Sequence, residues 1–123
     1  MSHIIKLSTK SDTRGSLTVI EKVLGFEIKR VYYIYNVDES NRGGHRHKIT
    51  TQAAVCIKGS CEIFVNNGKE ELTYTLNSPD QCLILETKDW HSMSNFTSDA
   101  VLLVLASEYY DPNDYIIQNY ETN

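Results

Sequence analysis

A chain of 123 residues, 41% hydrophobic and 23% charged, is long enough for one domain with a core and too apolar for a disordered protein. Its net charge of −4, without a long basic run, excludes the electrostatic footprint of a nucleic-acid-binding protein. No apolar run suits a membrane span or a signal peptide, and the three cysteines, with no CxxC spacing, fit free thiols in a reducing compartment. We therefore expect a single cytoplasmic domain over residues 1–123, either an enzyme or a binding module.

Short segments rich in β-branched and aromatic residues follow one another along the chain, with turn residues between them. Lys58-Gly59-Ser60 predicts a tight turn, and Asn67-Gly68 predicts a hairpin because both residues accept positive φ. Only the tail predicts a helical turn, after Pro112. The regular recurrence of strands predicts an all-β sandwich or barrel. The expected strands are 16–21, 30–37, 52–59, 60–68, 69–76, 81–86, 90–96 and 100–107.

The stretch NRGGHRHKITTQ places His45 and His47 two residues apart. Residues i and i+2 of a strand lie on one face, so both histidines are expected to point into the barrel while Arg46 points away. By the same rule Tyr33 and Tyr35 share a face, and an adjacent strand would put them near the histidines. The interior of a small barrel can hold one small ligand.

The two histidines could hold a metal, carry protons or simply end a strand. The segment resembles the first motif of the cupin superfamily, HxH-(x)3-4-E-(x)6-G, and His91-(x)3-Asn95 resembles the end of the second. Gln52 stands where metal-bearing cupins have a glutamate, which weakens the case for a metal. Histidine titrates near neutrality, so the pair could instead move protons within a bound molecule. A metal-dependent cupin enzyme and a non-catalytic ligand-binding cupin both remain open.

Several stretches together resemble the sugar 3,4-ketoisomerases that act on dTDP-4-keto-6-deoxyglucose, a cupin family. They are DTRGSLTVIE, RVYYIY, RGGHRHK, CIKGSCEIFVNNG, LILETKDWHSM and ASEYYDPNDYI. The resemblance implies a cupin jelly-roll barrel made of a small antiparallel double sheet, and catalysis without metal or organic cofactor. It also implies a dTDP-sugar substrate, a homodimer whose N-terminal strands are exchanged, and a place in deoxy-amino-sugar biosynthesis for surface polysaccharides.

Moving a ketone from C4 to C3 requires a base at C3, an enediol, a proton added at C4 and a proton exchanged between the oxygens. We expect His45 to be the carbon base and His47 the relay between the oxygens, although the reverse assignment remains open. Tyr33 is expected to hydrogen-bond the sugar oxygens or to position His45, with a core aromatic as the alternative.

Arg14 and His91 are expected to contact substrate. Their pairing resembles the branch of the family that gives the galacto-configured 3-keto product rather than its gluco epimer. Tyr35 and Gln52 are further expected substrate contacts. Arg42 could meet the pyrophosphate or remain a solvated loop charge.

Overall fold

The computed structural model describes residues 2–121, and short β-strands make up most of it. No α-helix occurs in this range, and the tail contains one 3-10 turn, η1 (Pro112–Asp114). The strands are β1 (His3–Lys6), β2 (Ser8–Asp12), β3 (Gly15–Val19), β4 (Arg30–Tyr35), β5 (Arg42–His47), β6 (Gln52–Lys58), β7 (Cys61–Asn66), β8 (Glu71–Leu76), β9 (Gln81–Leu85), β10 (Trp90–Ser94), β11 (Val101–Ala106) and β12 (Tyr115–Ile116).

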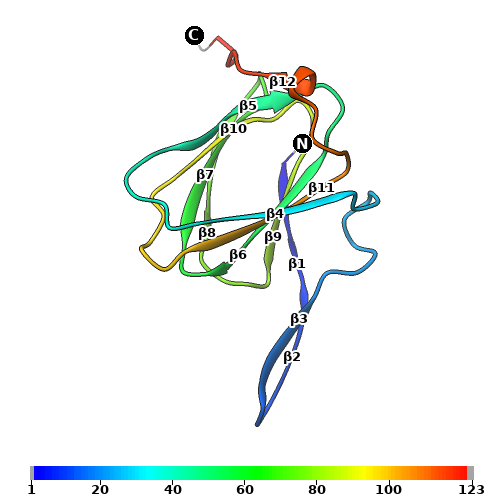
Figure 1. The fold of residues 1–123 in the computed structure, drawn as a ribbon, viewed down its shortest axis with the longest axis vertical. Coiled ribbons are helices and arrows are strands. Elements are labelled where there is room, and N and C mark those ends of the chain that lie inside the picture. Colours follow the sequence, from blue (N-terminus) through cyan, green and yellow to red (C-terminus); the bar gives the residue numbers. More distant parts are fainter. Residues whose placement is uncertain (1, 122–123) are drawn as a thin grey trace.

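Two antiparallel five-stranded sheets face each other. One has the order β1-β9-β6-β11-β4 and the other the order β12-β5-β10-β7-β8. Strands β2 and β3 pair only with each other and form a hairpin that projects from the body of the molecule, at the bottom of Figure 1. This arrangement confirms the predicted all-β fold, a cupin jelly roll built as an antiparallel double sheet.

Alternation along the strands divides the apolar residues between two clusters. The core between the sheets contains Ala54, Cys56, Cys61, Ile63, Val65, Leu76, Leu83, Leu85, Met93, Ala100, Leu102 and Val104. A second cluster lies on the outer face of the first sheet and contains Leu7, Leu24, Ala53, Val55, Cys82, Ile84 and Leu105. Strands β6 and β11 contribute to both clusters, so their continuous apolar sequences reflect burial on two faces. The three cysteines are free and buried, as small core residues should be.

The predicted turns are present. Gly59 joins β6 to β7 with a φ of +68°, and a Cβ there would come within 2.7 Å of Asp99 Oδ1 and 2.8 Å of Ala100 Cα. The hairpin at Asn67-Gly68 forms, but its loop spans residues 67–70 and only Gly68 has positive φ. The helical turn after Pro112 is confirmed as η1. Strands β1 and β2, at the N-terminus, were not predicted from the sequence.

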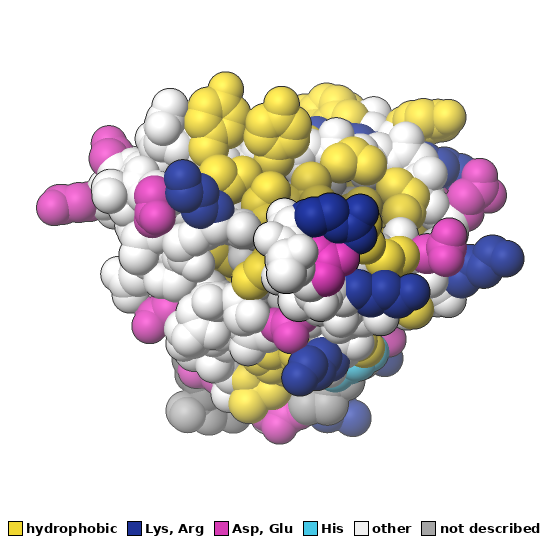
Figure 2. Space-filling model, turned by 90° about the horizontal axis from the view of Figure 1, so that it is seen from below, with side chains coloured by type: hydrophobic (Ala, Val, Ile, Leu, Met, Phe, Trp, Pro, Cys, Tyr) yellow, Lys and Arg dark blue, Asp and Glu magenta, His cyan; other side chains and the backbone are white. Residues whose placement is uncertain are grey.

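The outer face of the first sheet remains partly uncovered. Tyr33, Leu103 and Val55 lie side by side across β4, β11 and β6, and Tyr33 is 62% exposed. Figure 2, which views the molecule from the hairpin end, shows hydrophobic side chains gathered into a large patch. No helix within residues 2–121 is long and apolar enough to cross a membrane.

Candidate active site

Three histidines from two paired strands form one cluster. His45 and His47 lie on β5, and His91 lies opposite His45 on β10. The ring centroid of His45 is 4.9 Å from that of His47 and 5.0 Å from that of His91. The expected shared face of His45 and His47 is therefore confirmed. Arg46 points away as expected, because its guanidinium carbon lies 4.5 Å from the centroid of the Tyr120 ring.

Burial keeps two of these rings neutral. His91 is 1% exposed and its Nδ1 lies 3.0 Å from the carbonyl oxygen of Asp89. Loss of hydration lowers the pKa of His91 to about 3. His45 is half-buried, and burial together with the neighbouring His47 lowers its pKa to about 4. At neutral pH both rings are unprotonated and can each accept a proton.

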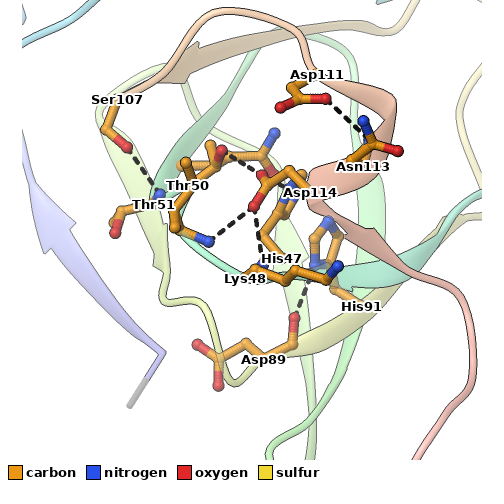
Figure 3. A network of polar contacts seen from close by, with 12 residues as sticks. His47, Lys48, Thr50, Thr51, Asp89, His91, Ser107, Asp111, Asn113 and Asp114 are labelled. Carbon is orange, nitrogen blue, oxygen red and sulfur yellow. Dashed lines mark hydrogen bonds and ion pairs between the residues drawn. The ribbon is translucent and has the colours of Figure 1, made fainter.

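His47 has a partner that the other two histidines lack. Its Nδ1 lies 2.8 Å from Oδ2 of Asp114, and both side chains are 4% exposed. Figure 3 shows this pair inside a polar network that joins the end of β5 to the C-terminal tail. The Nε2 atoms of His47 and His91 are buried and have no hydrogen-bond partner in the described chain. These two nitrogens are therefore available to a bound molecule.

The tail adds a phenol ring to the cluster. Strand β12 pairs with β5, which places Tyr115 opposite His47. The centroid of the Tyr115 ring is 4.5 Å from that of His45 and 4.7 Å from that of His47. Neither Tyr115 nor Asp114 was identified from the sequence, although both lie within the tail stretch that resembles the ketoisomerases.

The expected position of Tyr33 and Tyr35 is wrong within this chain. Their strand, β4, belongs to the other sheet and is not adjacent to β5. Both side chains point outward, with exposures of 62% and 57%, and their rings stack against each other. Tyr32, one residue earlier, points into the barrel instead and packs against the inner core.

Tyr32 and Gln52 form a polar pair inside the barrel. Gln52 is 1% exposed, and its Nε2 donates a hydrogen bond of 3.1 Å to the Tyr32 hydroxyl. Burial raises the pKa of Tyr32, while the hydrogen bond from Gln52 acts in the opposite direction. Oε1 of Gln52 is buried without a partner among residues 2–121.

The two arginines named from the sequence lie at different distances from the cluster. Arg42 begins β5 and is exposed, on the same strand as His45. Arg14 lies in the turn of the β2–β3 hairpin, where it forms an ion pair of 2.6 Å with Asp12. That hairpin projects from the opposite end of the molecule to β12 (Figure 1). Arg14 and His91 therefore do not meet within one chain.

The side chains of the cluster are of kinds that can accept and donate protons. Within residues 2–121, no group of three or more His, Cys, Asp and Glu side chains has the arrangement of a metal site. The cluster contains two neutral imidazoles, a third imidazole with a carboxylate partner, and the phenol of Tyr115.

Two facing antiparallel sheets with histidines inside the barrel define a cupin-type domain. The family model described as FdtA: WxcM-like, C-terminal, matches residues 1–122. The chain belongs to this FdtA family.

Characterised relatives are similar over almost the whole chain. A TDP-4-oxo-6-deoxy-alpha-D-glucose-3,4-oxoisomerase from Aneurinibacillus thermoaerophilus is 45% identical over 120 residues, covering 95% of this chain and 86% of that protein. A 3,4-ketoisomerase from Helicobacter canadensis superposes with a TM-score of 0.91 at 42% identity, covering 95% of this chain and 90% of that one. A mutant ketoisomerase from Thermoanaerobacterium thermosaccharolyticum, in complex with TDP-4-keto-6-deoxyglucose, gives 0.91 at 43% identity, with coverages of 95% and 87%.

Proposed function

We propose that the protein is a sugar-nucleotide 3,4-ketoisomerase, an enzyme that converts dTDP-4-keto-6-deoxyglucose into a dTDP-3-keto-6-deoxyhexose. The observation that carries the proposal is the pair of histidines on one face of β5, inside the barrel. The sequence of this chain is also 45% identical to that of an oxoisomerase of this substrate class. A 3-keto sugar is what an aminotransferase requires, so the reaction belongs to deoxy-amino-sugar biosynthesis. Nucleotide sugars of this kind favour a cytoplasmic enzyme.

His45 is the proposed carbon base. Its lowered pKa, about 4, keeps the ring unprotonated at neutral pH. It removes the proton from C3 of the sugar, and the electrons of that bond form the C3–C4 double bond of an enediolate. Return of the proton to C4 completes the exchange of the carbon-bound hydrogen. A positioned base of this kind contributes about 10²–10⁴-fold to the rate.

His47 is the proposed relay between the oxygens. The hydroxyl at C3 must lose its proton and the oxygen at C4 must gain one for the ketone to move. Nε2 of His47 has no partner in the described chain and can accept the first proton and donate the second. The neighbouring His45 ring lies 4.9 Å away, so both histidines reach one face of a sugar ring.

Other polar groups in the barrel are proposed to hold the substrate. The Tyr32 hydroxyl, and not that of Tyr33, is proposed to hydrogen-bond the sugar oxygens, because Tyr32 points inward beside Gln52. Gln52 keeps an unpartnered Oε1 that can accept a hydrogen bond from a sugar hydroxyl. Arg42, exposed on β5, suits the pyrophosphate. Tyr33 and Tyr35 point outward from their own barrel. They can contact a substrate only when that substrate is bound in the barrel of a second chain that packs against this face.

A homodimer with exchanged N-terminal strands is proposed from two features. The β2–β3 hairpin extends away from its own barrel (Figure 1), and the outer sheet face exposes Tyr33 and Val31. An exchanged hairpin would carry Arg14 to the histidine cluster of a second copy. Arg14 and His91 would then contact one substrate and give the galacto-configured product.

Complementation tests the exchange. His45→Asn and Arg14→Ala are each expected to be slow, but mixing them after unfolding and refolding forms heterodimers. An exchanged heterodimer has one site with an intact His45 from one chain and an intact Arg14 from the other. Activity that rises well above the sum of the two variants supports the exchange. No rise, with heterodimers verified by mass, contradicts it.

Deuterium exchange tests the assignment of the two histidines. With substrate in D₂O, His45→Asn should slow both the isomerisation of the sugar and the exchange of the C3 proton by about 10²–10⁴-fold. His47→Asn should isomerise slowly while C3 still exchanges, because its carbon base is intact. The opposite pattern would reverse the two roles.

A further inference from the structure

The C-terminal tail brings one carboxylate into the histidine cluster. Asp111 caps the 3-10 turn by accepting a 3.0 Å hydrogen bond from the Asn113 N–H, and Pro112 supplies a fixed φ at the start of the turn. Asp114 is the last residue of this turn and is buried, with an exposure of 5%. Strand β12 then pairs Tyr115 with His47 and holds the tail against β5.

Asp114 accepts four hydrogen bonds, divided between its two oxygens. Oδ1 accepts from the backbone N–H groups of Lys48 and Ile49, at 2.9 and 2.7 Å. Oδ2 accepts from Thr50 Oγ1 at 2.5 Å and lies 2.8 Å from His47 Nδ1. Burial alone would raise the pKa of Asp114, but the hydrogen bonds from Thr50, Ile49 and His47 lower it to about 2. The carboxylate is therefore ionised, and His47 must carry a proton on Nδ1 to bond with it.

The other two histidines have no such partner. His91 meets Asp89 through a backbone carbonyl and not through its carboxylate. His45 is surrounded by the rings of His47, His91 and Tyr115. Within residues 2–121, His47 is thus the one ring of the cluster that pairs with a carboxylate.

We propose that Asp114 is a positioning residue that fixes His47 in its Nδ1–H form and stabilises the imidazolium formed when Nε2 accepts the hydroxyl proton. This inference rests on the proposed isomerase function. The proposal accounts for the different roles of the two histidines. His45 has no carboxylate partner and serves as a neutral base. His47 has one, so it can carry a positive charge after it accepts the C3 hydroxyl proton and before it donates a proton to the C4 oxygen. A segment 67 residues away in sequence thereby tunes the relay without touching substrate.

Asp114→Asn changes the partner of His47 while it keeps the side chain in place, because the backbone donors do not move. The N–H groups of Lys48 and Ile49 keep the amide oxygen at the position of Oδ1. The amide NH₂ then replaces Oδ2 and donates to Nδ1 of His47, which forces the ring into its Nε2–H form. His47 can no longer accept a proton at Nε2. We expect kcat to fall about 10²–10⁴-fold with KM within about 3-fold, since a wrong tautomer impairs the chemistry rather than binding.

Asp111→Asn is the matched control, because it is the same change in the same turn, and asparagine caps a turn as well as aspartate does. It should leave kcat within about 2-fold.

In Asp114→Asn, the C3 proton should still exchange with solvent deuterium at a near-normal rate, because His45 is untouched. Loss of that exchange together with turnover would mean general disruption of the site and would overturn the proposal.

A double-mutant cycle separates positioning of His47 from any other role. In a His47→Asn background, adding Asp114→Asn should slow turnover by less than about 3-fold, because the ring that Asp114 orients is gone. Independent, multiplicative losses would overturn the proposal.

The tautomer can be read without substrate. In ¹⁵N-labelled protein at neutral pH, the His47 ring should carry its proton on Nδ1 in the wild type and on Nε2 in Asp114→Asn. An Nε2–H ring in the wild type, or no change in the variant, would overturn the proposal. If the wild type did not isomerise the keto sugar, the proposed function would fail while these spectra still decided the role of Asp114.

Discussion

Protonation of the buried His91 should weaken the fold in mild acid. The ring is 1% exposed, and burial lowers its pKa from an ordinary value of 6.5 to about 3. Because the folded pKa lies below the unfolded one, the unfolded chain binds the extra proton between these values. The stability contributed by neutral His91 is thus fully present above pH 6.5 and is lost as the pH falls toward 3.

The magnitude follows from the two pKa values. At pH 5 the unfolded ring is almost fully protonated while the folded ring is not, and each pH unit below 6.5 is worth about 1.4 kcal/mol. Between pH 7 and pH 5, this group should therefore lower the free energy of unfolding by about 2 kcal/mol. His45 acts in the same direction, whereas Asp89, whose pKa is raised by burial, acts in the opposite one.

The contribution of His91 is isolated by comparison with His91→Asn. Urea unfolding of both proteins at pH 7 and pH 5 gives two differences in unfolding free energy, and the contributions of His45 and Asp89 largely cancel between them. The wild type should lose about 2 kcal/mol more than the variant over this interval. Equal losses in the two proteins would refute the reasoning, because they would show that His91 does not stay neutral in the folded state.

Two further predictions concern the turn after β6 and the need for metal. Gly59→Ala should lower the free energy of unfolding by about 2–5 kcal/mol, measured by urea unfolding, because a Cβ at positive φ would collide with the backbone at Ala100; a loss below about 1 kcal/mol would contradict this. Protein treated with chelator should keep its isomerase activity, since the proposed chemistry uses imidazoles alone; activity that disappears and returns only with a divalent ion would show that a metal takes part.

The sequence predicted those features that a local pattern determines. Alternating apolar residues indicated most strands, Gly59 indicated a turn, and the two-residue spacing placed His45 and His47 on one face. The same rule could not say which face of β4 points inward. Tyr32 and Tyr33 are both tyrosines, so aromatic character does not show which of them points inward. The register of β4 against β11 shows it, because Tyr32 lies opposite Val104 of the inner core.

The missing parts of the site depend on contacts between distant segments. Asp114 reaches His47 only because the tail returns to pair with β5. No local sequence pattern near either residue predicts that pairing. Strands β1 and β2 were missed because their side chains are mostly exposed and polar, which leaves little alternation to detect. The assumption that Arg14 and the histidines share a site also fails within a single chain, because the hairpin extends away from its own barrel (Figure 1).

The central claim is that this chain moves a ketone from C4 to C3 of a dTDP-bound sugar through His45. The most direct measurement follows dTDP-4-keto-6-deoxyglucose by NMR in the presence of wild-type protein and, separately, of folded His45→Asn. The account predicts that the wild type produces a 3-keto-6-deoxyhexose, with the galacto configuration at C4, and that the variant is slower by about 10²–10⁴-fold. An unchanged sugar with the wild type, or near-normal turnover by the variant, would contradict it.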